Sequence, residues 1–169
     1  MFKSNNVKVT AIIIILTIVG LDLFTKWLVS LYLTPYQVKP VIDGFFNIVY
    51  AMNLGSAFSF LHSAPAWFRK PFFFIIPLAA MVFIVYIMLK AQKNKIQFFA
   101  FACVLGGALG NFISRIYPGY VIDFLDVRIT NTYHWPSFNV ADIGITIGLI
   151  LVMLDMAKME SKKKKSRKK

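Results

Sequence analysis

The chain has 169 residues, of which 58% are hydrophobic, and a formal net charge of +12. Soluble domains are about 45–50% apolar, and the apolar residues here form long blocks. This excludes a soluble globular fold and indicates an all-α polytopic membrane protein with a single domain over residues 1–169. Its one cysteine, Cys103, and two isolated histidines exclude an intrachain disulfide and give no metal-ligand spacing.

Four apolar blocks are long enough to cross a membrane, because about 20 helical residues span a hydrocarbon core. We expect transmembrane helices at about residues 9–33, 72–89, 96–113 and 138–156. The second and third are joined by the short connection KAQKNK. The other connections, 34–70 and 117–137, are long and contain most of the polypeptide outside the helices.

Lysine and arginine set the orientation, since they gather in cytoplasmic loops. Lys3, Lys8, the KAQKNK connection and the basic tail 158–169 share one side if both termini are cytoplasmic. The sequence therefore predicts a multi-pass membrane protein with both termini cytoplasmic and the long connections on its outer face. The net positive charge lies mainly in this tail, which favours anionic lipid headgroups over nucleic acid as its partner.

The two long connections differ in pattern. In the first, VKPVIDGFFNIVYAMN places β-branched and aromatic runs around an Asp43-Gly44 turn signal, which predicts a hairpin or small sheet on the outer face. In the second, DFLDVRITNTYHW mixes charges with aromatic residues, which is typical of a segment at the membrane interface.

The seven acidic residues fall into two groups. Asp155 and Glu160 lie among lysines at the inner end of the fourth helix, where we expect solvated side chains. The other five belong to the outer half: Asp22, Asp43, Asp123, Asp126 and Asp142. A charge inside a membrane helix costs about 2.5–3.5 kcal/mol on insertion scales and usually faces the bundle interior.

Asp123 and Asp142 are predicted to share one leaflet, because the third helix runs outward and the fourth runs inward. Each of these helices also carries a G-x-x-x-G pair, at 106/110 and at 144/148, and such faces let helix backbones approach closely. Two carboxylates at one site hold one proton between them. The ionised group can activate a water and the protonated group can donate to a carbonyl oxygen, with no metal or other cofactor.

A structural alternative explains the same residues without chemistry. Asp142 or Asn139 caps the fourth helix, since both types are favoured N-caps, and Asp123 is an ordinary loop aspartate paired with an arginine. Asp22 and Lys26, spaced i, i+4, form an ion pair that holds the bundle together.

Four further polar residues also have two interpretations: Asn53, Gly55, Asn111 and Arg115. They hydrogen-bond a peptide substrate, or they satisfy the protein's own irregular backbone at membrane depth.

Five motifs carry a family resemblance: DLFTK, NLGSAFS, GGALGNFISR, VIDF and FNVAD, in this order. From about residue 20 to 156 the chain resembles the lipoprotein signal peptidases (signal peptidase II), aspartic peptidases of bacterial plasma membranes. The resemblance implies four transmembrane helices with a small outer β-sheet. It also implies cleavage of prolipoproteins just before a cysteine that carries diacylglycerol, so that lipid-modified prolipoproteins and membrane lipids are the partners.

The resemblance also implies roles for single residues. Asp123 and Asp142 match the catalytic aspartates. The remaining matches support the site or hold the substrate backbone: Asn53, Gly55, Asn111, Arg115, Asn139, Asp22 and Lys26. Three positions depart from the family pattern, with Leu23 for Gln, Ser56 for Ala and Ser114 for Asp. At Ser114 a supporting contact of Arg115 is either lost or taken over by the hydroxyl.

Two rival classes remain to be compared. A small non-enzymatic transporter or assembly subunit needs polar groups through the whole membrane depth, whereas the inner halves of the third and fourth helices carry no charge before Lys95 and Asp155. A serine peptidase has candidate nucleophiles, but the sequence lacks a G-x-S-x-G motif. Both comparisons favour the aspartate pair.

Overall fold

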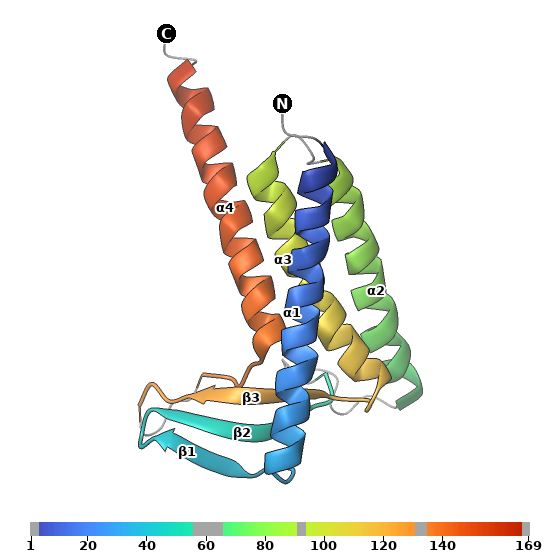
Figure 1. Cartoon of the computed structure of the whole chain (residues 1–169), viewed down its shortest axis with the longest axis vertical. Helices are drawn as coiled ribbons and strands as arrows, with labels where there is room; N and C mark the ends of the chain where they lie inside the picture. Colours follow the sequence, from blue (N-terminus) through green and yellow to red (C-terminus); the bar gives the residue numbers. More distant parts are fainter. Residues whose placement is uncertain (1–3, 56–65, 91–93, 131–134, 167–169) are drawn as a thin grey trace.

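The computed structural model describes residues 4–55, 66–90, 94–130 and 135–166. Four helices form a bundle: α1 (Ser4–Tyr32), α2 (Ala66–Lys90), α3 (Lys95–Ile116) and α4 (Val140–Ser166). Both ends of the chain lie at one end of this bundle, and a small sheet lies across the other end (Figure 1). The motif residue Ser56 and parts of both long connections fall outside the described residues.

All four helices are long and apolar enough to cross a membrane, with mean hydropathies between 1.8 and 2.4 in their most apolar windows. This confirms the predicted fold class, although each helix extends beyond its predicted bounds at one end or both. The largest difference is at α4, which continues to Ser166 through the lysine-rich tail. Lys, Met, Ala and Glu are good helix formers, so the helix continues beyond its apolar stretch.

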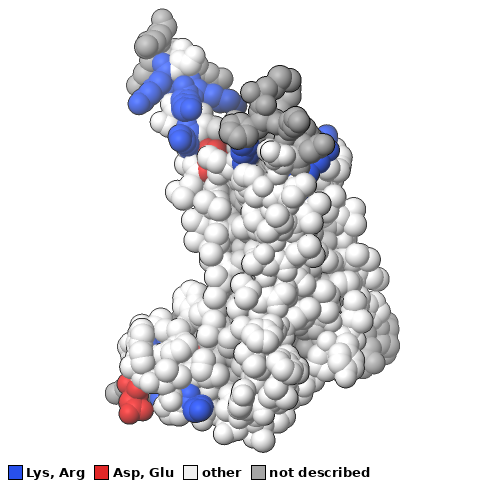
Figure 2. Space-filling model, viewed as in Figure 1, with Lys and Arg blue, Asp and Glu red and all other residues white. Residues whose placement is uncertain are grey.

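The charged side chains gather at the two ends of the molecule. In the view of Figure 2, lysines and arginines cluster at the end of α4 and beside the termini, and a few charges mark the sheet end. The face between them consists of uncharged residues, as expected for a surface in contact with lipid.

The sheet has three antiparallel strands in the order β1 (Val38–Ile42), β2 (Phe46–Asn53) and β3 (Val121–Val127). The predicted hairpin is confirmed, and its turn contains Gly44 at a φ of 73°, a conformation that suits glycine. The third strand was not predicted, because its segment was interpreted as interfacial. Residues 121–124 are all buried, so the strand lacks the alternating pattern that identifies a half-exposed strand.

Helix α3 is the centre of the bundle and packs against the three other helices. Glycines allow the close approaches. A Cβ at Gly148 of α4 would lie 2.5 Å from the Ala100 carbonyl of α3, and one at Gly107 of α3 would collide with the Ala141 carbonyl of α4. The 106/110 pair of α3 provides a close approach to α1, where these glycines pack near Ile15, Ile18 and Asp22.

The expectation that Asp155 is solvated was also wrong. Its side chain is buried, and its Oδ2 accepts a hydrogen bond of 2.6 Å from Asn94 Nδ2. Asn94 is at the same time the N-cap of α3, where its Oδ1 accepts from the backbone of Ile96 and Gln97. Asp155 therefore ties α4 to the beginning of α3. Glu160, in contrast, is exposed and pairs with Lys164.

Candidate active site

The beginning of α4 is held by a reciprocal pair of hydrogen bonds. Asp142 N donates to Asn139 Oδ1, and Asn139 N donates to Asp142 Oδ2, each over 3.1 Å. Asn139 is thus the N-cap and Asp142 the third helical residue of a capping box. The capping interpretation is therefore correct for both residues, but it uses only one of the two carboxylate oxygens of Asp142.

Strand β3 brings Asp123 to the same place. Asp123 is only 6% exposed. Its carboxylate accepts two amide hydrogen bonds, from Asn139 Nδ2 to Oδ1 at 2.6 Å and from Asn53 Nδ2 to Oδ2 at 2.9 Å. Asn139, which is fully buried, thus hydrogen-bonds to Asp123 through its side chain and to Asp142 through its backbone N–H and side-chain oxygen. One residue joins the two predicted aspartates.

Helix α1 contributes a buried ion pair below this position. Lys26 Nζ lies 2.7 Å from Asp22 Oδ2, and the two side chains are almost completely shielded from solvent. The other oxygen of Asp22 accepts a 2.9 Å hydrogen bond from the backbone N–H of Ala141. The predicted ion pair is present, and it also binds the N-terminus of α4, which favours negative charge.

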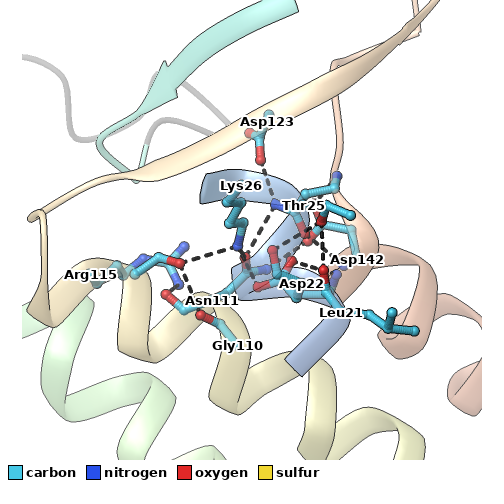
Figure 3. Close-up of polar contacts among 12 residues, drawn as sticks. Leu21, Asp22, Thr25, Lys26, Gly110, Asn111, Arg115, Asp123 and Asp142 are labelled. Atoms are coloured by element: carbon cyan, nitrogen blue, oxygen red, sulfur yellow. Dashed lines mark hydrogen bonds and ion pairs between the residues drawn. The ribbon is translucent and has the colours of Figure 1, made fainter. Parts of the chain in front are cut away.

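Helix α3 connects this ion pair to Asp142. Asn111 Oδ1 accepts from Lys26 Nζ at 2.9 Å, and Asn111 Nδ2 donates to Asp142 Oδ1 at 2.8 Å. Figure 3 shows residues from α1, α3, β3 and α4 converging on this single polar cluster.

Arg115 and Ser114 occupy neighbouring positions on α3 but have different contacts. Arg115 Nη1 donates to the Asn111 carbonyl at 3.3 Å, while its buried Nε has no acceptor among the described residues. The Ser114 hydroxyl donates to the Gly110 carbonyl and accepts from Lys26 at 3.2 Å. Ser114 therefore contacts Lys26. Of the two alternatives for this position, the described residues favour a lost contact of Arg115 over one taken up by the hydroxyl.

The end of β2 forms a turn beside Asp123. Gly55 N donates to Asn53 Oδ1 at 2.8 Å, so Asn53 orients this turn while its amide nitrogen holds Asp123. Gly55 has a φ of 104°, and a Cβ there would meet the Phe73 ring. Only glycine suits both conditions.

Burial raises the pKa of Asp123 from its ordinary 3.8 to about 6, and the neighbouring Asp142 charge acts in the same direction. The hydrogen bonds from Asn53 and Asn139 and the charge of Lys26 oppose the shift. A carboxyl in this range can hold or release a proton near neutral pH, as an acid catalyst requires.

A groove of about 310 Å³ opens beside Asp142 along α4. Its lining is mainly apolar: Trp135, Phe138, Asp142, Ile143, Thr146 and Ile147. Asp142 is only partly buried, so this carboxylate is accessible from an apolar groove. The arrangement can present a carboxylate and a proton-holding carboxyl to a bound peptide.

The structure thus gathers the predicted site residues around the two aspartates, while Asp43 stays exposed in the β1–β2 turn. One buried pair was missed. Asn47 Nδ2 donates to Asp126 Oδ2 at 2.6 Å, because these residues face each other in the β2–β3 register. The hint in the sequence was the second aspartate of VIDFLDV, three residues after the first. It indicates a partner on β2 only after this segment is known to be a strand.

Comparison with known proteins agrees with this geometry. The family model described as Signal peptidase (SPase) II matches residues 14–158. The chain belongs to this family. A lipoprotein signal peptidase of Syntrophus aciditrophicus is 44% identical over 144 residues, covering 85% of this chain and 89% of that protein. One from Francisella tularensis subsp. novicida is 42% identical over 158 residues, covering 93% and 96%.

Solved structures show the same fold. A bacterial membrane enzyme determined by the in meso method at 2.3 Å resolution superimposes with a TM-score of 0.79 and 35% identity, over 91% of each chain. The expected signal peptidase II membership is confirmed, and with it an aspartic peptidase activity that removes signal peptides from prolipoproteins. The transporter and serine peptidase alternatives were wrong.

Proposed function

We propose that Asp123 and Asp142 are the catalytic dyad of this signal peptidase. The observation that carries the proposal is Asn139, whose side chain binds Asp123 while it shares a capping box with Asp142. An N-cap alone would need only the contacts within α4. The additional 2.6 Å bond to a buried aspartate on β3 is what a positioned pair of carboxyls requires.

The two aspartates have unlike surroundings, which supports distinct roles. Asp123 is the more buried, and with a pKa of about 6 it is the carboxyl that keeps a proton more readily. Asp142 lies in the first turn of α4, accepts a hydrogen bond from the Asn139 N–H and borders the apolar groove. Asp142 then removes a proton from the attacking water, and Asp123 donates its proton to the scissile carbonyl oxygen.

The resulting gem-diol breaks down when Asp142 passes its proton to the leaving nitrogen and the bond to that nitrogen cleaves. As the carbonyl re-forms, one gem-diol hydroxyl returns its proton to Asp123. The dyad ends the cycle with one proton, as it began. A bound substrate excludes water and thereby favours the protonated state of Asp123 further.

The surroundings of the dyad indicate how a lipid-modified prolipoprotein would bind. The apolar groove beside Asp142 suits the hydrocarbon part of a diacylglyceryl-cysteine, and it follows α4 into the membrane-spanning region. The buried Arg115 Nε–H has no acceptor in the described part of the chain and can donate to a peptide carbonyl. The Asn53–Gly55 turn supplies further backbone polar groups at the same place.

The orientation is supported by the charged ends of the helices: the start of α1 and the lysine-rich end of α4 lie at the end of the bundle opposite the sheet (Figures 1 and 2). Positive charge favours the cytoplasmic side. We therefore assign both termini to the cytoplasm, where the tail lies near anionic lipids, and the dyad to the outer side. A C-terminal reporter active only in the cytoplasm tests this assignment, and a silent reporter would reverse it.

The dyad is tested with Asp123→Asn and Asp142→Asn in reconstituted enzyme. Each should lower signal-peptide release from a diacylglyceryl-modified prolipoprotein by about a hundredfold or more, the usual effect of losing an acid or base group. Asp43→Asn is the matched control, since Asp43 is exposed in the β1–β2 turn, and should cleave normally. An unlipidated substrate tests the diacylglyceryl requirement. Near-normal cleavage by either dyad variant would remove that aspartate from the mechanism.

A further inference from the structure

Among the described residues, the buried Lys26 ammonium has three acceptors, of which one, Asp22, is anionic. It donates to Asp22 Oδ2 at 2.7 Å, to Asn111 Oδ1 at 2.9 Å and to Ser114 Oγ at 3.2 Å. Lys26 and Ser114 are both almost fully buried, at 4% and 3% exposure. A charge shielded from water acts over longer distances than one at the surface.

Two hydrogen bonds connect this ammonium to Asp142. Asn111 accepts from Lys26 with its oxygen and donates to Asp142 with its nitrogen. Lys26 polarises the Asn111 amide, and its positive charge therefore strengthens the hydrogen bond that Asn111 donates to the Asp142 carboxylate. The same amide oxygen also accepts from Asn139 Nδ2 at 3.2 Å, so the contact includes the residue that binds Asp123.

The charges that face the dyad can be counted for the described residues. Helix α1 supplies Asp22 and Lys26, and α3 supplies Arg115. Strand β3 and helix α4 supply the two aspartates themselves, while β2 supplies the neutral Asn53. With one proton on the dyad, two positive and two negative charges remain, and the cluster is neutral.

We propose that Ser114 is a positioning residue that sets the pH range of catalysis, because its neutral hydroxyl leaves the Lys26 charge balanced by Asp22 and the dyad alone. This rests on the proposed dyad. A carboxylate at position 114 would contact Lys26 and add a third negative charge to a buried cluster of four. The dyad would then bind its protons more tightly, and both limbs of the pH–rate profile would move to higher pH.

The expected displacement follows from the short path between position 114 and Asp142. A unit charge about 10 Å away acts through an effective dielectric constant of about 20, which corresponds to about one pH unit. A purely structural role for Ser114 would lower activity at every pH and leave the profile in place.

The experiment compares Ser114→Asp with Ser114→Asn, two side chains of equal size that differ in charge. The readout is kcat/KM for a fluorogenic diacylglyceryl-modified prolipoprotein peptide in micelles, measured from about pH 4 to about pH 9. Ser114→Asp should move both limbs upward by about one unit, and Ser114→Asn should keep the original limbs whatever its absolute rate. Coinciding profiles for the two variants would overturn the proposal.

A second pair of variants tests the same charge if Ser114→Asp fails to insert. Lys26→Gln removes the ammonium and should also move the limbs to higher pH, whereas Lys26→Arg keeps the charge and should not. Unmoved limbs in Lys26→Gln would contradict the proposal. Failure here is distinct from failure of the dyad, which would show as cleavage by Asp123→Asn or Asp142→Asn.

Discussion

Replacing Asp123 with asparagine should abolish cleavage and, at neutral pH, stabilise the fold. The pKa of Asp123 is about 6 in the folded protein against an ordinary value of 3.8, chiefly because of burial. A raised carboxyl pKa means that the folded state binds the proton more tightly than the unfolded state. The free energy of unfolding therefore falls as pH rises, and the total loss is about 3 kcal/mol once the pH exceeds the folded pKa.

The clean measurement is the difference in stability between variant and wild type as a function of pH. Asparagine does not titrate, and the mismatch of its amide with the Asn53 and Asn139 donors costs the same at every pH. Between about pH 4 and about pH 7 the variant should gain about 2 kcal/mol relative to wild type. In thermal unfolding followed by tryptophan fluorescence in micelles, this is a relative shift of about 4–8 °C.

Asp43→Asn serves as the control for this measurement, since the exposed Asp43 carboxylate has no burial cost to relieve. Its difference from wild type should stay flat over the same pH range. The reasoning would be refuted if the Asp123→Asn difference also stayed flat, or if wild type gained stability relative to the variant as pH rises. Either result would mean that Asp123 is not a buried carboxyl with a raised pKa.

Two other predictions concern the packing of α3 and α4. Gly148→Ala should lower the free energy of unfolding by about 1–3 kcal/mol, because its Cβ would lie 2.5 Å from the Ala100 carbonyl. The control is Gly20→Ala, at a glycine with open space around it. Equal thermal midpoints for the two variants would contradict the packing argument. Asn94→Ala should lower the free energy of unfolding by about 2 kcal/mol, because it removes the α3 cap and leaves the buried Asp155 without its amide donor. An unchanged thermal midpoint would show that this contact is not formed in solution.

The membrane-spanning architecture could be predicted because it depends on length and hydropathy, which are properties of single segments. The expectation that Asp123 and Asp142 lie at the same end of the bundle followed from the alternating direction of consecutive helices. The bridge that Asn139 forms between them did not follow, because it depends on β3, whose residues 121–124 are all buried and so lack the alternating burial of a half-exposed strand. The pairing of Asn47 with Asp126 was missed for the same reason, since it depends on strand register.

Two long-range partners of polar side chains were missed for a common physical reason. Asp155 and Ser114 were each interpreted from their sequence neighbours, lysines in one case and Arg115 in the other. Their actual partners are Asn94 and Lys26, which lie 61 and 88 residues away in the chain. A polar side chain on a buried helix face bonds to the helix opposite, and a single sequence does not show which residue lies there.

The ion pair of α1 positions the proposed dyad in addition to holding the helices of the bundle together. Asp22 binds Lys26 through one oxygen and the first turn of α4 through the other. It reaches this position because α3 has a glycine there: a Cβ at Gly110 would lie 2.6 Å from Asp22 Oδ2. The N-terminus of α4 carries Asp142, and its cap Asn139 holds Asp123. The separation of the two aspartates therefore depends on how closely α1 approaches α3, so a substitution at Gly110 should disturb catalysis through Asp22 without touching either aspartate.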